Sequence, residues 1–139
     1  MSKITQTTEV SKKWTFYSDI FTDFSRNAVT GELNKKTNES SIKQSVKNLL
    51  LTDKYERLFN PEIGAKLKSI LFENATPVLP QILNDYIADV FDNYEPRALF
   101  SYADIRIDHD RNGANIDVHF VIINTGVQVT LPIFIERTR

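Results

Sequence analysis

The sequence contains no cysteine among its 139 residues, so it has no disulfide, no thiolate nucleophile and no cysteine-based zinc site. Glycine is scarce as well, with four residues, and no glycine-rich phosphate loop or nucleophile elbow is present. The two histidines, His109 and His119, lack the spacing of metal ligands, and we expect both at the surface. Nothing in this inventory supports catalysis, and no metal or cofactor is expected.

The sequence also has no excess of charge of one sign, because it contains 17 basic and 18 acidic residues and has a formal net charge of −1. A nucleic-acid-binding domain usually has a basic excess, so no nucleic-acid partner is expected. No segment approaches the ~20 apolar residues that span a bilayer, and the first residues have no apolar signal core. We therefore expect a soluble protein that is not secreted by the usual route and has no membrane partner.

The chain is long enough for one hydrophobic core, and its 41% hydrophobic and 25% charged residues are ordinary globular values. Residues 1–13 are polar and predict a flexible arm, which leaves residues 14–139 as a single domain. Trp14 and Phe16 alternate with polar neighbours, as in a short strand or an extended docking arm. Residues 27–31 predict a turn, and residues 34–40 a polar loop.

The middle of the chain has the spacing of helices. Residues 41–51 place apolar side chains at i, i+4, i+7 and i+8, with capping residues among 38–41. Asn60-Pro61 predicts the start of a second helix, because asparagine caps a helix and proline is tolerated at its first position. The apolar residues expected to be buried by these two helices are Ile42, Val46, Leu49, Leu50, Ile63, Leu67, Ile70 and Leu71.

Thr76-Pro77 predicts the start of a third and longest helix in the same way. Pro80 lies early enough to be tolerated, although it favours a later start. The helix should end near Asn93, because Pro96 disfavours helical geometry at the residue before it. Its expected buried face consists of Leu79, Ile82, Leu83, Tyr86, Ile87, Val90 and Phe91.

From Ala98 the apolar period changes to two, which predicts three strands joined by turns at residues 110–113 and 124–126. The class is therefore α+β: about three helices followed by a small antiparallel three-stranded C-terminal sheet, with an extended N-terminal arm or short strand. The expected inward positions are Leu99, Ala103, Ile105 and Ile107, then Ile116, Val118, Phe120 and Ile122, then Val127, Val129, Leu131, Ile133 and Ile135.

Charge pairing favours one register for the first hairpin. A four-residue loop at Asp110–Gly113 places Arg106 opposite Asp117 and Asp104 opposite His119. A two-residue Asn112-Gly113 turn would instead place Asp108 opposite Asp117, which are like charges. We prefer the longer loop.

The third strand contains Pro132, which cannot donate a ladder hydrogen bond. The strand is therefore expected to lie at the edge of the sheet.

Glu95, Pro96 and Arg97 form a corner between the last helix and the sheet. Proline stiffens this turn, so the two opposite charges should lie close together. They could simply bind each other or nearby backbone, which is worth about 0–1 kcal/mol at an exposed site. Alternatively, Arg97 could fork onto a carboxylate or the carbonyl groups at a helix end of a partner.

Five segments in this order resemble the gene-25-type baseplate wedge proteins of contractile-tailed phages, whose relatives occur in type VI secretion baseplates. The resemblance covers roughly residues 15–107 closely and the C-terminal hairpins in pattern. The segments are Tyr17-Ser18-Asp19-Ile20, Ser41-Ile42-Lys43-Gln44-Ser45, Phe59-Asn60-Pro61-Glu62-Ile63-Gly64, Leu71-Phe72-Glu73-Asn74-Ala75-Thr76-Pro77 and Asn93-Tyr94-Glu95-Pro96-Arg97.

The resemblance implies a structural subunit of the virion tail baseplate, assembled in the host bacterial cytoplasm. It implies partners among the other wedge proteins, the tail sheath protein and the tail tube. It implies that Glu95, Pro96 and Arg97 bind the helical core bundle that the other wedge proteins form. It assigns strand pairing with sheath arms, which primes the first sheath ring, to the third strand, whose expected contacts are Val127, Val129, Leu131, Ile133 and Ile135.

The alternative is a peptidoglycan-degrading tail lysozyme, a label that members of this family often carry. A glycosidase needs two carboxylates across a cleft, one of them kept protonated by apolar surroundings. Glu73 has apolar neighbours, but its position also fits the polar end of a helix. A regulatory adaptor that binds host proteins through the same surface is a third hypothesis.

Overall fold

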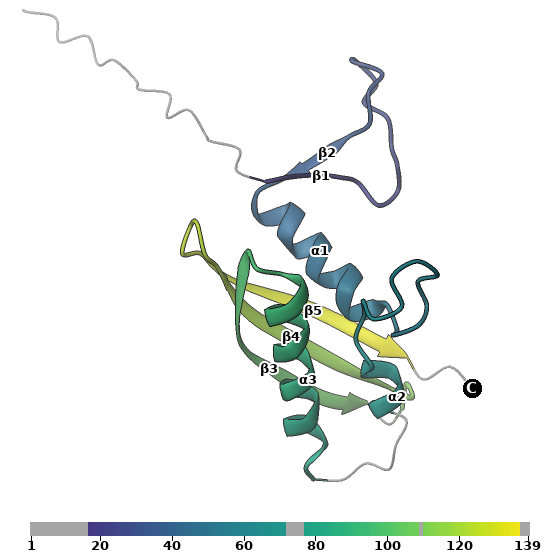
Figure 1. Cartoon of the computed structure of the whole chain (residues 1–139), viewed down its shortest axis with the longest axis vertical. Helices are drawn as coiled ribbons and strands as arrows, with labels where there is room; N and C mark the ends of the chain where they lie inside the picture. Colours follow the sequence, from purple (N-terminus) through teal and green to yellow (C-terminus); the bar gives the residue numbers. More distant parts are fainter. Residues whose placement is uncertain (1–16, 72–76, 109, 137–139) are drawn as a thin grey trace, which may run out of the picture.

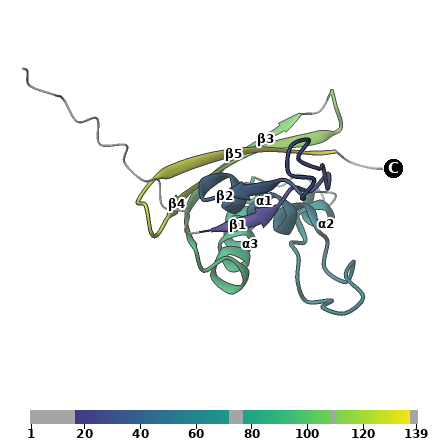
Figure 2. The ribbon, with the colours of Figure 1, turned by 90° about the horizontal axis from the view of Figure 1, so that it is seen from above.

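The computed structural model describes residues 17–71, 77–108 and 110–136. The predicted α+β class is confirmed, because three helices precede a three-stranded antiparallel sheet of order β3-β4-β5 (Figure 1). Figure 2 shows the helices gathered on one face of this sheet. The predicted arm at residues 1–13, Trp14 and Phe16 lie outside the described residues.

One core joins the helices to the inner face of the sheet. Its largest fully buried apolar side chains come from both layers. They are Ile42, Leu50, Leu67, Leu83, Ile87, Phe91, Ile116, Phe120 and Ile122.

A small hairpin precedes the helices. Strand β1 (Ser18–Ile20) pairs with β2 (Lys35–Thr37), which lies inside the segment predicted as polar loop. The predicted turn at residues 27–31 is confirmed, since the Gly31 N–H donates to the Asn27 carbonyl at 2.9 Å. Both strands are largely exposed, so they lack the apolar alternation from which the sequence could have predicted β2.

Helix α1 spans Glu39–Leu51 and begins two residues before the predicted start. Asn38 holds the N-cap position, but its side chain does not cap the helix. Its Oδ1 instead accepts from the Tyr17 N–H at 3.4 Å, so this residue joins the hairpin to the helix. The predicted apolar face is confirmed as buried, with Ile42, Val46, Leu49 and Leu50 in the core.

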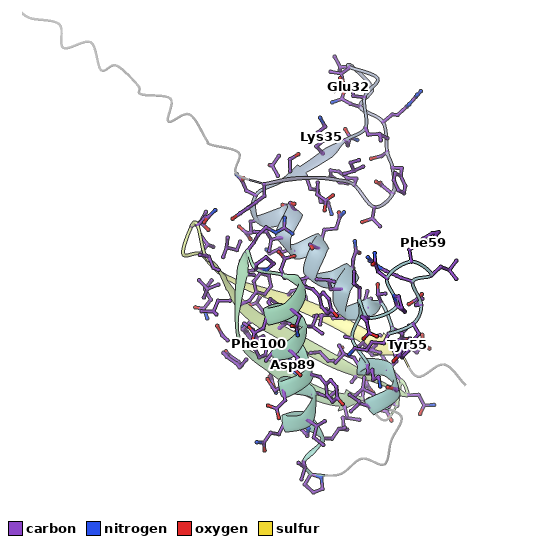
Figure 3. The ribbon with its side chains drawn as sticks, viewed as in Figure 1. Glu32, Lys35, Tyr55, Phe59, Asp89 and Phe100 are labelled. Carbon is purple, nitrogen blue, oxygen red and sulfur yellow. The ribbon has the colours of Figure 1, made fainter. Side chains whose placement is uncertain are left out.

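Helix α2 spans only Leu67–Leu71, so the predicted start at Asn60-Pro61 is wrong. Gly64 has a φ of 142°, which no α-helix accommodates. The Pro61 carbonyl, which a helix would need, accepts from the Tyr55 N–H at 2.8 Å. These contacts form a projecting loop between α1 and α2, and Figure 3 shows Phe59 pointing away from the body of the molecule.

Helix α3 spans Leu79–Tyr94 and ends one residue past the predicted Asn93. Starting at Leu79 places Pro80 in the first turn, where its missing N–H is not needed. Two residues of the predicted face, Ile82 and Tyr86, are 38% and 36% exposed. The buried side is narrower and consists of Leu79, Leu83, Ile87, Val90 and Phe91.

Strand β3 (Ala98–Asp108) reverses its phase at a bulge between Phe100 and Tyr102. Ala98 and Phe100 therefore face the core before the bulge, and Ala103 after it. The prediction of Leu99 as an inward residue is wrong, since this side chain is 60% exposed. A strict period of two could not include the extra residue.

Strand β4 (Gly113–Ile122) buries all four predicted inward residues, and β5 (Gln128–Glu136) buries four of five. Val127 precedes β5 and is 43% exposed. The predicted turn at residues 124–126 is confirmed by a bond from the Gly126 N–H to the Ile122 carbonyl at 2.8 Å. The sheet order confirms that β5, with Pro132, is an edge strand.

The predicted register of the first hairpin is wrong by two residues. Asp104 faces Asp117, and Arg106 faces Asn115. The last pair is Asp108–Gly113, so the loop has the predicted four residues but begins one residue earlier, at 109. Charge pairing misled the prediction because Arg106 reaches Asp117 diagonally and lies 3.7 Å from Asp104, so it neutralises both.

His119 faces Tyr102 in this register, and their rings stack at 4.3 Å. Its Nδ1 also lies 3.0 Å from the Thr130 hydroxyl on β5. His109 lies outside the described residues.

Replacing Gly64 by alanine is expected to lower the free energy of unfolding by about 2–4 kcal/mol. The new Cβ would lie 2.6 Å from the Thr52 carbonyl oxygen, at a φ that alanine rarely adopts. Gly31→Ala is the matched control, since Gly31 has a φ of 71° and open space around it; it should cost about 1 kcal/mol. Urea unfolding measures both losses, and equal losses would contradict the role of the close approach.

Candidate partner-binding corner and sheet edge

The corner begins where α3 ends. The Glu95 N–H donates to the Phe91 carbonyl at 3.0 Å, and the Glu95 carbonyl accepts from the Ala98 N–H at 3.2 Å. Pro96 therefore lies in a tight turn that leads directly into β3, and it is exposed. This geometry matches the predicted stiff turn between helix and sheet.

The Glu95 side chain points inward and is only 2% exposed. Its Oε2 accepts from the Ser45 hydroxyl of α1 at 2.5 Å. Its two oxygens also accept from Arg97, from Nε at 2.5 Å and from Nη2 at 2.9 Å. Both oxygens of this buried carboxylate are thus bonded, which offsets the cost of removing a charge from water.

Arg97 lies at the surface end of this pair, with 29% of its side chain exposed. Its guanidinium lies 5.3 Å from the centre of the Tyr17 ring, a cation–π distance. The hydrogen bonds that Arg97 donates to Glu95 raise the pKa of Arg97 above its ordinary value, against the opposing effect of burial. Since Nε and Nη2 hold Glu95, Nη1 is the nitrogen that bonds to none of the described residues.

The two charges of the corner therefore have different positions, one buried and one at the surface, which the sequence could not distinguish. Glu95 is a positioning residue that fixes the direction of the guanidinium. Pro96 and Arg97 are the parts that a partner can touch. Ser45 and Tyr17 contact these two charges and were not among the predicted site residues, although both lie in the segments that carry the family resemblance.

Four of the five side chains predicted to pair with sheath arms lie in the core rather than at the surface. Val129, Leu131, Ile133 and Ile135 are buried beneath the helices, and Val127 precedes the strand. What β5 offers a partner is its backbone edge. Its exposed alternate residues share that edge, and these are Gln128, Thr130, Pro132, Phe134 and Glu136.

The position of Pro132 preserves pairing within the sheet. The Ile122 N–H donates to the Val127 carbonyl at 3.0 Å, so this pair is hydrogen-bonded. Such pairs alternate along an antiparallel ladder, so Pro132, opposite Asp117, lies at a position that is not hydrogen-bonded to β4. Its missing N–H falls on the outward edge, where Thr130 and Phe134 keep theirs. None of the described residues bonds to these outward groups.

Features of a catalytic or metal site are sparse in the part of the chain that the structure describes. No three histidine or acidic side chains there come together in a group that could hold a metal ion. Glu73 lies outside the described residues. None of the helices between residues 17 and 136 that the structure places is long and apolar enough to cross a membrane.

A protein-family model described as baseplate wedge protein gp25 matches residues 36–127. The chain belongs to this family. The match includes the three helices, the corner, β3 and β4, and it ends one residue before β5. The resemblance seen in the sequence is thereby confirmed, and the gp25 family is one of baseplate structural proteins.

A gp25 relative with this name occurs in Enterobacteria phage T4. It is 42% identical over 57 residues, which cover 41% of this chain and 43% of the relative. The alignment thus spans less than half of either protein.

Two solved structures share the fold. A chain of the anti-feeding prophage baseplate has a TM-score of 0.67 at 20% identity, over 76% of this chain and 85% of that one. A Geobacter sulfurreducens protein with the provisional name tail lysozyme has a TM-score of 0.64 at 16% identity, over 70% of this chain and 89% of that one. At these identities the likeness shows the fold alone.

Ser45→Ala is expected to lower the free energy of unfolding by about 1–3 kcal/mol, because it removes a hydrogen bond to a buried charged group. Ser40→Ala is the matched control, since Ser40 is exposed on the same helix. It should change stability by less than about 0.5 kcal/mol. Chemical denaturation compares the two, and an equally small loss for Ser45→Ala would show that the hydroxyl does not hold Glu95.

Proposed function

We propose that this protein joins the core bundle of the baseplate wedge to the first ring of the tail sheath. It is a structural subunit of the virion baseplate, assembled in the host cytoplasm. The observation that carries the proposal is the Arg97 guanidinium, which buried Glu95 orients while one nitrogen remains available at the surface. In this role residues 14–139 act as one domain.

The inward contact is made by Pro96 and Arg97. A guanidinium presents planar N–H groups that suit a carboxylate or the carbonyl groups at the C-terminal end of a helix. A bundle of helices from other wedge proteins supplies both kinds of acceptor. Because Glu95 already holds two of the guanidinium nitrogens, little side-chain entropy is lost when the partner binds.

The outward contact is made by the free edge of β5. An unpaired strand edge carries a row of N–H and C=O groups that an extended segment of another chain can complete. An arm of a sheath subunit that pairs here would prime the first sheath ring. The buried β5 side chains hold the strand against the core while its outward backbone groups bond to the new strand. The tail tube is a further neighbour in such a ring.

We propose a structural role rather than peptidoglycan hydrolysis. The one carboxylate that is buried among the described residues, Glu95, is bonded to an arginine and a serine. A glycosidase instead needs two carboxylates that face each other across a cleft. The bonds to Arg97 and Ser45 use both carboxylate oxygens of Glu95 to hold the corner together.

Arg97→Lys is expected to leave the domain folded and to reduce its incorporation into baseplates. A lysine ammonium can keep the ion pair with Glu95, but it cannot hold that carboxylate with a fork and also present a planar N–H group outward. The measurement is the amount of variant protein in purified baseplates when the variant replaces the native chain. Arg106→Lys, a similar change at an exposed arginine of β3, should be incorporated normally. Equal incorporation of both variants would refute the contact at Arg97.

Thr130→Pro is expected to abolish attachment of the sheath while the baseplate still forms. The change removes an outward N–H at a position that, like Pro132, is not hydrogen-bonded to β4, so the existing sheet is kept. Thr130→Val is the control, because it keeps the N–H and loses only the contact with His119. Electron microscopy counts the baseplates that carry sheath. If the proline and valine variants carry it equally, strand pairing at β5 is wrong.

A further inference from the structure

The free edge of β3 is occupied by a side chain of α3. Asn84 Oδ1 accepts from the Ala103 N–H at 2.7 Å, and its Nδ2 donates to the Ala103 carbonyl at 3.1 Å. Both backbone groups of Ala103 therefore point away from β4 and toward α3. The amide of Asn84 satisfies them as the backbone of a neighbouring strand would.

Asn84 is itself held in place. Its Nδ2 also donates to the Pro80 carbonyl at 3.0 Å, so both hydrogens of the amide nitrogen are used. These three bonds determine the orientation of the amide and leave it little freedom to move aside for an incoming strand.

The part of the β3 edge that precedes Ala103 is also a poor template. The bulge at Phe100–Tyr102 interrupts the regular spacing of its outward groups. The Ala98 N–H is taken by the Glu95 carbonyl at 3.2 Å, within the corner. Helix α3 packs against this strand, and Figure 1 shows the helix crossing it at an angle. Bulges and covering helices are known protections of strand edges.

The opposite edge has one interruption, the missing N–H of Pro132. The backbone N–H and C=O groups of Thr130 and Phe134, on either side of it, face outward and bond to no described residue. The two edges of the same sheet therefore differ: one carries a side-chain amide in the place of a partner strand, and the other does not.

We infer that Asn84 closes the β3 edge, so that the sheet accepts an added strand only at β5. The occupant is one extended segment of a sheath subunit, an identity that rests on the function proposed above. A sheet with a single receptive edge can at most form a closed pair through two β5 edges. A sheet with two receptive edges could join β3 to β5 repeatedly, which gives open-ended growth. Because of Asn84, strands can be added to this subunit at one edge only, so the sheet can start an assembly that grows in one direction.

The test uses the full chain alone and measures its mass in solution by sedimentation. The wild-type chain should sediment as a monomer or, at high concentration, a dimer. Asn84→Ala exposes the backbone groups of Ala103, and its weight-average mass at the same concentration should more than double. The double variant Asn84→Ala with Thr130→Pro should return to the wild-type mass, because the second edge is then interrupted.

A folded Asn84→Ala chain with the wild-type mass would overturn the inference, and so would a wild-type chain that already forms open-ended polymers. Because neither result involves sheath or wedge proteins, failure here is distinguishable from failure of the proposed function. If Asn84→Ala does not fold, hydrogen exchange in the wild-type chain decides instead. The Ala103 amide should exchange at least tenfold more slowly than the Thr130 and Phe134 amides, and equal rates would overturn the inference.

Discussion

The carboxylate of Glu95 is a negative charge buried where α1, α3 and β3 meet. Burying an ionised carboxylate costs several kcal/mol unless its oxygens find partners, and here Ser45 and Arg97 supply them. Each bond constrains a different part of the fold. Ser45 fixes the position of α1, the Glu95 backbone ends α3 and starts β3, and Arg97 is left with a single orientation at the surface. The proposed contact with the wedge core therefore depends on a group that the partner never touches.

The sheet shows a similar dependence on hidden polar groups. Its two edges have the same kind of backbone, and only small features decide which can take a strand. On β3 the amide of Asn84 and a bulge occupy or distort the edge. On β5 the single proline lies where its missing N–H does not weaken the ladder to β4. Asymmetry of this kind suits a subunit that must receive one partner strand and then stop.

Two of the prolines and the strict apolar alternation of β4 predicted the structure well. Pro80 and Pro96 bracket α3 closely, and the inward residues of β4 follow a period of two without interruption. The failures have physical causes. The bulge in β3 adds a residue that a period of two does not contain. The predicted second helix is broken at Gly64, which has a φ of 142°, and the next residue, Ala65, donates its N–H to the Thr52 carbonyl of an earlier segment. The burial of Glu95 was unpredictable because its partner Ser45 lies 50 residues away, and charged residues are seldom buried.

The corner leads into β3 and the open edge belongs to β5, and β4 separates these two outer strands of the sheet. Neighbouring strands are about 4.8 Å apart, so β3 and β5 are roughly 10 Å apart across the sheet. Because the ladder hydrogen bonds and one shared core connect the three strands, the direction of an added strand follows from the direction of the bundle. A rigid sheet between two contacts would thus transmit the geometry of the wedge to the first sheath ring.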